Sequence, residues 1–144
     1  MRKALVAIIA LAGLSIPVVA SATGKHHVRF TSKVIGAGIS TNQAAYRIHD
    51  SHFGNGAGVQ TVKVTGTHGT DSEITYYGNA TARTKGTFTL GTPDANGIAP
   101  LSGSGHDTGG TGKAKGLRST YTYTGTVNTK SGVFKVTLKG TYRY

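Results

Sequence analysis

Hydrophobic and polar positions alternate most regularly in the last part of the chain, within 132–144. The expected inward set is Phe134, Val136, Leu138 and Tyr142, and the expected outward set is Lys135, Lys139 and Arg143. A period of two held over this length is typical of a strand with one buried face and one solvated face. The segment 117–129 repeats the pattern and places Tyr121 and Tyr123 on the face opposite Arg118.

Shorter segments of the same kind come earlier in the chain. We expect strands at 28–35, 44–50, 59–65, 73–83, 86–90 and 98–101, with a tight corner at 84–85. Turns or loops are expected at 36–43, 51–58, 67–72 and 92–97, and in the glycine-rich run 103–116. No segment after residue 22 shows a convincing helical period.

These observations predict an all-β protein. Glycine, threonine, valine and tyrosine dominate the composition, and these residues suit pleated strands and the turns between them. About eight strands in so short a chain favour a closed antiparallel β-barrel, because closure removes unpaired edges. A β-sandwich is the alternative architecture.

The first 22 residues have the features of a cleaved signal peptide. Arg2 and Lys3 precede an apolar stretch, and Ala20-Ser-Ala22 gives the small-residue pattern of a cleavage site. We therefore expect a signal peptide at 1–22, a single barrel domain at 23–144, and a secreted protein.

The charge balance is strongly basic, with 16 lysines and arginines against five acidic residues and a net charge of +11. Several cations alternate with apolar neighbours, which predicts a basic outer surface. Such a surface attracts anionic cell-wall or polysaccharide polymers through long-range electrostatics, or simply keeps the protein soluble. No motif of a specific nucleic-acid-binding fold is present.

Neither a metal site nor a cofactor is expected. The six histidines include His49 and His52, whose spacing puts them on opposite faces of a strand, and the chain has no cysteine. The glycine-rich run is followed by a strand pattern, whereas a phosphate-binding loop requires a helix at that point.

Asp107 and Arg118 are the candidate polar groups of a binding site. Asp107 is the one acidic residue close in sequence to other titratable groups, and a carboxylate near an arginine can bind the polar end of a guest. The alternative is a local bond from Asp107 to the backbone of the loop. Strand alternation puts Arg118 outside, unless a bulge in the glycine-rich run turns it inward.

The segment from Gly109 to Arg118, Gly-Gly-Thr-Gly-Lys-Ala-Lys-Gly-Leu-Arg, resembles a turn of the allene oxide cyclase and dirigent barrel families. The segment 77–90 is similar to the strand pair that precedes this turn in small secreted bacterial relatives. The resemblance covers about 44–144 and implies an eight-stranded barrel, often trimeric, with an apolar pocket. Arg118 falls where these families keep an arginine. Lys113, however, stands where many keep an acid, and no cysteine matches one often seen in the cyclase pocket.

Two functions remain open at this point. The first is a secreted barrel that binds a small apolar guest, with Asp107, Arg118, Tyr121, Tyr123 and Tyr142 as ligand-binding residues. Steering of the cyclisation or coupling of that guest is the enzymatic form of this hypothesis. The second is a non-enzymatic basic protein that docks on an anionic surface. An effect of salt on binding would distinguish them.

Overall fold

The computed structural model describes residues 26–144, so the expected signal peptide and its cleavage site lie outside the described residues. The strands are β1 (His27–Ser40), β2 (Gln43–Asp50), β3 (Gly54–Thr65), β4 (His68–Tyr77), β5 (Ala80–Leu90), β6 (Ile98–Thr111), β7 (Arg118–Asn128) and β8 (Val133–Arg143). A short 3-10 helix, η1 (Gly112–Ala114), joins β6 to β7. Within this part of the chain, no helix has the length and apolar character needed to cross a membrane.

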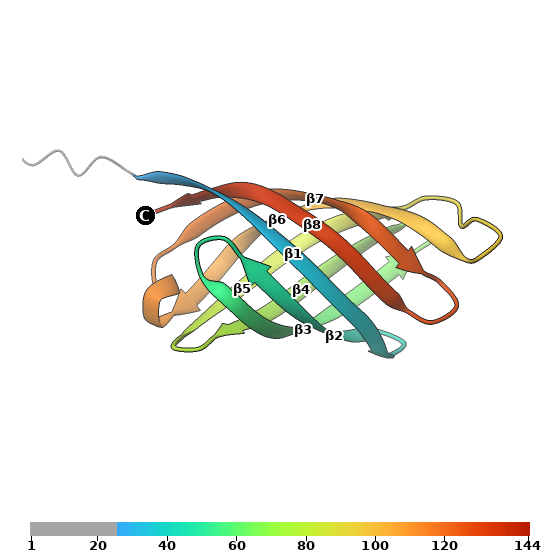
Figure 1. The fold of residues 1–144 in the computed structure, drawn as a ribbon, viewed down its shortest axis with the longest axis horizontal. Helices are drawn as coiled ribbons and strands as arrows, with labels where there is room; N and C mark the ends of the chain where they lie inside the picture. The colour runs from blue at the N-terminus through green and yellow to red at the C-terminus, as the bar shows by residue number, and fades with distance from the viewer. Residues whose placement is uncertain (1–25) are drawn as a thin grey trace, which may run out of the picture.

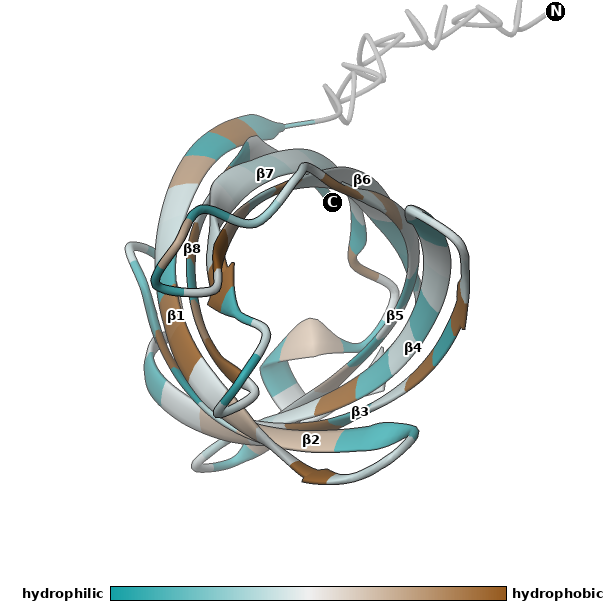
Figure 2. Cartoon of the chain, turned by 90° about the vertical axis from the view of Figure 1, so that its right-hand side faces the viewer, coloured by the Kyte–Doolittle hydropathy of each residue, from teal (hydrophilic) through white to brown (hydrophobic). Residues whose placement is uncertain are grey.

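The eight strands form a closed antiparallel barrel (Figures 1 and 2). Each strand pairs with its neighbour in sequence, and β8 returns to pair with β1 from Arg143 opposite His27 to Val133 opposite Ala37. Closure leaves the sheet without a free edge. The predicted all-β barrel is therefore confirmed, and the sandwich alternative is excluded.

The predicted inward and outward faces of β8 are also confirmed. Tyr142 is buried and the apolar side chains before it are half-buried, whereas Lys135, Lys139 and Arg143 are exposed. Burying an unpaired ammonium group would be costly, so alternation fixes which face of the strand is inside.

The division of the middle of the chain into strands differs from the prediction. The expected strand 73–83 is broken by a hairpin turn between β4 and β5, and the expected corner at 84–85 lies within β5. Gly78 begins this two-residue turn with φ of 53°, and Gly66 begins the turn from β3 to β4 with φ of 62°. A positive φ at the first turn residue suits the twist of paired strands and favours glycine.

Four glycine-containing segments that we expected to be turns or loops belong wholly or partly to strands. The run that begins at 103 continues β6 as far as Thr111, β1 extends to Ser40, β3 already begins at Gly54, and β4 begins at His68 within the expected turn 67–72. Opposite Arg83 and Thr84, a bulge at Thr108 shifts the register of β6.

Aromatic rings explain why glycine is tolerated inside these strands. Tyr121 lies directly opposite Gly105, and Tyr123 lies opposite Gly103 on the same pair of strands. The same arrangement joins Gly58 with Tyr46, Gly69 with Phe88, Gly36 with Phe134 and Gly140 with Phe30. At each of these glycines an added Cβ would lie under 3.0 Å from the ring. The narrow interior is thus filled by rings that lie against bare backbone.

The two ends of the barrel differ. The loops β1–β2, β5–β6 and β7–β8 lie at one end, while η1, the start of β1 and the end of β8 lie at the other (Figure 1). At the η1 end, Phe53 from the β2–β3 turn stacks on Tyr77 at 5.2 Å between ring centroids and meets Tyr142 edge-on at 5.3 Å. Ala114 and Leu117 are buried in the same cluster. We call this the closed end, and the opposite end the mouth.

Candidate functional site

A cavity of about 410 Å³ opens at the mouth and runs into the barrel interior. This volume lies within the range of small-molecule sites. Most of its wall is apolar, and the aliphatic and phenylalanine side chains that line it are Val34, Ile48, Val62, Val64, Phe88, Leu90, Leu101, Val127, Phe134, Val136 and Leu138. Figure 2 looks along the barrel from the mouth.

Four polar side chains of the cavity come from three different strands. Tyr46 on β2, Glu73 on β4, and Tyr121 and Tyr123 on β7 all point inward and line it. The glycines opposite the three tyrosines let the rings lie flat against the wall. The cavity therefore combines apolar walls with a few convergent polar groups.

Glu73 is the carboxyl group of this cavity. The hydroxyls of Thr84 and Tyr46 donate to its Oε2 at 3.2 and 3.4 Å, respectively. Tyr46 also shares a 2.6 Å hydrogen bond with Thr75. The two bonds to Glu73 are long and end on the same oxygen, and among the described residues no hydrogen bond reaches Oε1.

Burial, and secondarily the charge of Asp71, raises the pKa of Glu73 to about 7. Asp71 lies two residues before Glu73 on the same face of β4, where the Tyr123 hydroxyl donates to its Oδ2 at 3.2 Å. Burial raises the pKa of Asp71 as well. A carboxyl group with a pKa near neutrality can both donate and accept a proton under ordinary conditions.

The closed end holds a different carboxyl group, Asp50. Its Oδ2 accepts hydrogen bonds from Ser32 at 2.5 Å and from Tyr142 at 2.9 Å. Its Oδ1 accepts the backbone N–H groups of His52 and Phe53, both at 2.8 Å. Asp50 thereby ties β1, β8 and the β2–β3 turn together, which is a structural role.

The structure separates the sequence-predicted site residues. Tyr121 and Tyr123 line the cavity, but Tyr142 bonds Asp50 at the closed end. Asp107 is buried beside Ser119, and Arg118 is exposed on the outer face of β7.

Asp107 is buried and Arg118 is exposed, and the charge of Arg118 acts on Asp107 by lowering the pKa of its carboxyl, against the larger effect of burial. The ligand-binding role of this pair stays a prediction. Ser119 takes the inward position on β7, and the bulge at Thr108 shifts β6 without turning Arg118 inward. Ser119 on β7 hydrogen-bonds the buried carboxyl of Asp107. Burial raises the pKa of this carboxyl, and its Oδ2 has no hydrogen-bond partner among the described residues.

Sequence reasoning missed Glu73. The apolar residues Ile74 and Tyr76 share one face of the expected strand 73–83, but Tyr76 is exposed, and Glu73 and Tyr77 on the other face point to the interior. The turn at Gly78 is the signal that would have corrected the interpretation, since Gly-Asn between two alternating runs is typical of a hairpin.

No group of three or more potential metal ligands is found within 26–144. The histidines of this part of the chain are all exposed. His52 contacts the hydroxyl of Tyr144 through its Nε2, outside the closed end.

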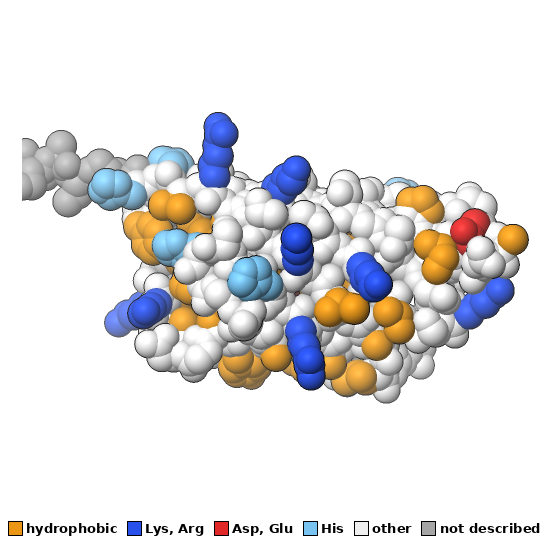
Figure 3. Space-filling view, viewed as in Figure 1, with side chains coloured by type: hydrophobic (Ala, Val, Ile, Leu, Met, Phe, Trp, Pro, Cys, Tyr) orange, Lys and Arg blue, Asp and Glu red, His pale blue; other side chains and the backbone are white. Residues whose placement is uncertain are grey.

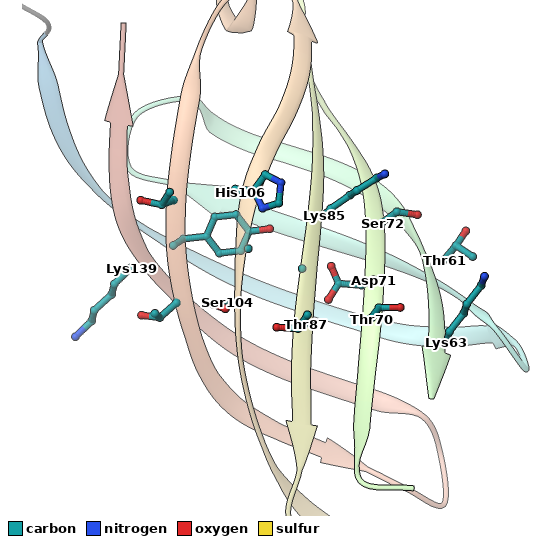
Figure 4. A pocket seen from close by; sticks show the side chains of 15 residues that line it. Thr61, Lys63, Thr70, Asp71, Ser72, Lys85, Thr87, Ser104, His106 and Lys139 are labelled. Atoms are coloured by element: carbon teal, nitrogen blue, oxygen red, sulfur yellow. The ribbon is translucent and has the colours of Figure 1, made fainter. Parts of the chain in front are cut away.

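A shallow groove crosses the outer face of β3 to β8 (Figure 4). Lys63, Lys85, Lys139 and His106 lie along it among serine and threonine hydroxyls. Lysines and arginines are spread over the surface, which shows hardly any acidic side chain on the face seen in Figure 3. Asp94 is the one exposed acidic residue within the described range.

No protein-family model matches the chain, and comparisons with curated proteins and with solved structures found no match either. The resemblance to the allene oxide cyclase and dirigent barrels therefore stays a prediction from the sequence.

Proposed function

We propose that the protein binds a small, largely apolar guest inside the barrel, through the mouth. The observation that carries this proposal is the cavity of about 410 Å³ with apolar walls, which Glu73 alone faces among the carboxyl groups of the described chain. A barrel whose purpose was purely structural would gain stability by filling this space with side chains.

The expected steering of a cyclisation or coupling step belongs to the same proposal. A carboxyl group whose pKa is about 7 is suited to exchange a proton with a bound molecule, and Glu73 meets that requirement. Export from the cell, expected from residues 1–22, would place this binding outside the cytoplasm.

Binding of a neutral fluorescent apolar probe, N-phenyl-1-naphthylamine, tests the proposal. Val136 lines the cavity, so Val136→Trp should fill it and abolish the rise in fluorescence. Lys135→Trp, with its side chain on the outer face of the same strand, is the matched control and should bind as the wild type does. Equal binding by both variants, with circular dichroism showing both folded, would refute interior binding.

A second candidate function is docking on an anionic cell-wall polymer or polysaccharide. The outer groove with Lys63, Lys85 and Lys139 favours it, because all the described lysines and arginines are exposed and Asp94 is the exposed acid. A groove of one charge sign attracts a polyanion over long range.

Heparin serves as the polyanion in the test of this second function. Binding should weaken steeply as salt is added and should fall further when the three groove lysines are replaced by glutamine. Replacing Lys113, Lys115 and Lys130, which lie outside the groove, gives a variant of the same net charge. Equal losses in both triple variants would show that the groove has no special role.

A further inference from the structure

The barrel wall separates the charges of the described chain by sign. Asp50, Asp71, Glu73 and Asp107 face the interior, whereas every lysine, arginine and histidine within 26–144 is exposed. Buried carboxylates in proteins are ordinarily paired with a cation or fully hydrogen-bonded. Asp50 satisfies this rule through its four hydrogen bonds, but Glu73 does not.

Glu73 lies where a guest would reach it. It lines the cavity, its two hydrogen bonds end on Oε2, and the described residues leave Oε1 without a donor. The next carboxyl group on this face, Asp71, adds negative charge, and its own Oδ2 accepts a bond from Tyr123. Among residues 26–144, no positively charged side chain lines the cavity. The interior thus offers negative charge without a counter-ion.

Aromatic rings surround the same position. Tyr46 donates to Glu73, and Tyr121 and Tyr123 line the adjoining wall. The face of an aromatic ring attracts a cation, and the attraction is larger where water is excluded. Apolar walls continue from these rings towards the mouth.

We propose that the guest is an amine, an apolar molecule with one cationic nitrogen, and that Glu73 is its counter-ion. This inference rests on the proposed function of interior binding and names the chemical class of the guest. The ammonium group would donate to the free oxygen of Glu73 and lie against the tyrosine rings, while the apolar body fills the rest of the cavity. A carboxylate guest is disfavoured because it would meet the carboxylate of Glu73.

Three probes with the same eight-carbon chain test the charge preference: octylamine, 1-octanol and octanoate. Calorimetry on the barrel protein at pH 8 should rank octylamine first, about tenfold or more above 1-octanol, because hydrogen bonds between charged groups are the stronger ones. Octanoate should bind weakest.

Glu73→Gln keeps the size of the side chain and removes its charge. This variant should lose about tenfold or more in affinity for octylamine and change by less than about twofold for 1-octanol. Asp94→Asn is the matched control, since it removes one negative charge from the exposed surface and should leave all three affinities unchanged.

The outcomes distinguish a failure of the amine inference from a failure of interior binding. If 1-octanol binds as well as octylamine, or octanoate binds tightest, the amine inference is overturned while interior binding stands. If Glu73→Gln keeps the full preference for octylamine, Glu73 is not the counter-ion and the inference fails. Absence of binding by all three probes and by the neutral fluorescent probe would overturn interior binding itself.

Discussion

The closed end and the mouth of the barrel each hold an inward carboxyl group, in very different surroundings. Asp50 accepts four hydrogen bonds of 2.5 to 2.9 Å from side chains and backbone. Glu73 accepts two bonds of 3.2 and 3.4 Å, both on the same oxygen, and faces a cavity. A fully satisfied carboxylate holds the fold together, whereas a partly satisfied one costs stability and is available to bind a guest.

The comparison also shows what the aromatic side chains do at each end. At the closed end Phe30 stacks on Tyr142 at 4.0 Å, and Phe53 packs against both Tyr77 and Tyr142. Towards the mouth, Tyr46, Tyr121 and Tyr123 lie on glycines and leave space between them. Aromatic side chains thus close one end of the barrel and line a cavity towards the other.

The largest effect is expected for Asp50→Ala. Ser32, Tyr142 and two backbone N–H groups would lose their acceptor in a buried place, so the variant should lose about 3–5 kcal/mol of unfolding free energy in urea. Asp94→Ala is the control, because exposed Asp94 also accepts two backbone N–H groups, at 2.8 and 2.9 Å. It should lose about 1 kcal/mol. Similar losses in both variants would contradict the structural role given to the closed end.

Leu138→Ala should destabilise the protein by about 2 kcal/mol. This is the low end for such a change, because Leu138 is half-buried and already borders the cavity. Its outward neighbour supplies the control, and Lys139→Ala should stay within about 0.5 kcal/mol. Urea unfolding measures both, and a larger loss for Lys139→Ala would invert the assignment of the two faces.

Glu73 should make the protein less stable as the pH rises. Its pKa is raised from 4.5 to about 7 in the folded state, so the folded protein binds the proton more tightly than the unfolded chain does. Stability is therefore greatest below pH 4.5 and is lost as the pH passes through 7. In Glu73→Gln this contribution is absent, so the stability of the variant relative to the wild type should rise by about 3 kcal/mol from pH 4.5 to pH 8.

Comparison with the variant isolates Glu73 from the other groups around it. Asp71 on β4, with its own raised pKa, and the tyrosines at 46, 121 and 123 are present in both proteins. Urea unfolding at the two pH values gives the four free energies required. If the difference in unfolding free energy between wild type and variant does not change with pH, then Glu73 has the same pKa in the folded and unfolded states, and the expected pH dependence is wrong.

The smallest effect is expected for Arg118→Ala. The side chain is exposed on the outer face of β7, so stability should change by less than about 0.5 kcal/mol and binding of the neutral probe should not change. Arg118→Ala is compared with Tyr121→Phe, which removes a hydroxyl from the cavity itself. Fluorescence titration measures both, and a loss of binding in Arg118→Ala alone would restore the role that the sequence suggested for this residue.

The alternation of apolar and polar residues predicted the barrel because it can be recognised within a single strand and determines which face of that strand is buried. The pattern in 117–129 and 132–144 alone identified the two faces of β7 and β8, and closure followed from the number of strands and the absence of edges. The position of Gly78 in a turn could also have been read locally, from the Gly-Asn pair.

The candidate site was not predictable in the same way. Glu73 matters because β2, β5 and β7 bring Tyr46, Thr84 and Tyr121 around it, and these residues lie far apart along the chain. Glycine content misled the interpretation of 103–111 as a loop, because the rings that make glycine useful there come from β7. Such cross-strand pairs depend on register, which the sequence specifies only after the turns are known.

The pairing of β1 with β8 has a consequence for how the chain folds. During synthesis β1 emerges before any other strand, yet one of its edges finds a partner only when β8 has been made. Until then its backbone groups, together with the exposed Ile35 and Ile39, remain open to pairing with another chain. Arg29 and Lys33 on the same strand would discourage such pairing by mutual repulsion between nascent chains. Pairing of β1 with β8, which closes the barrel, is thus expected to be the slow step of folding, because it joins the strands farthest apart in sequence.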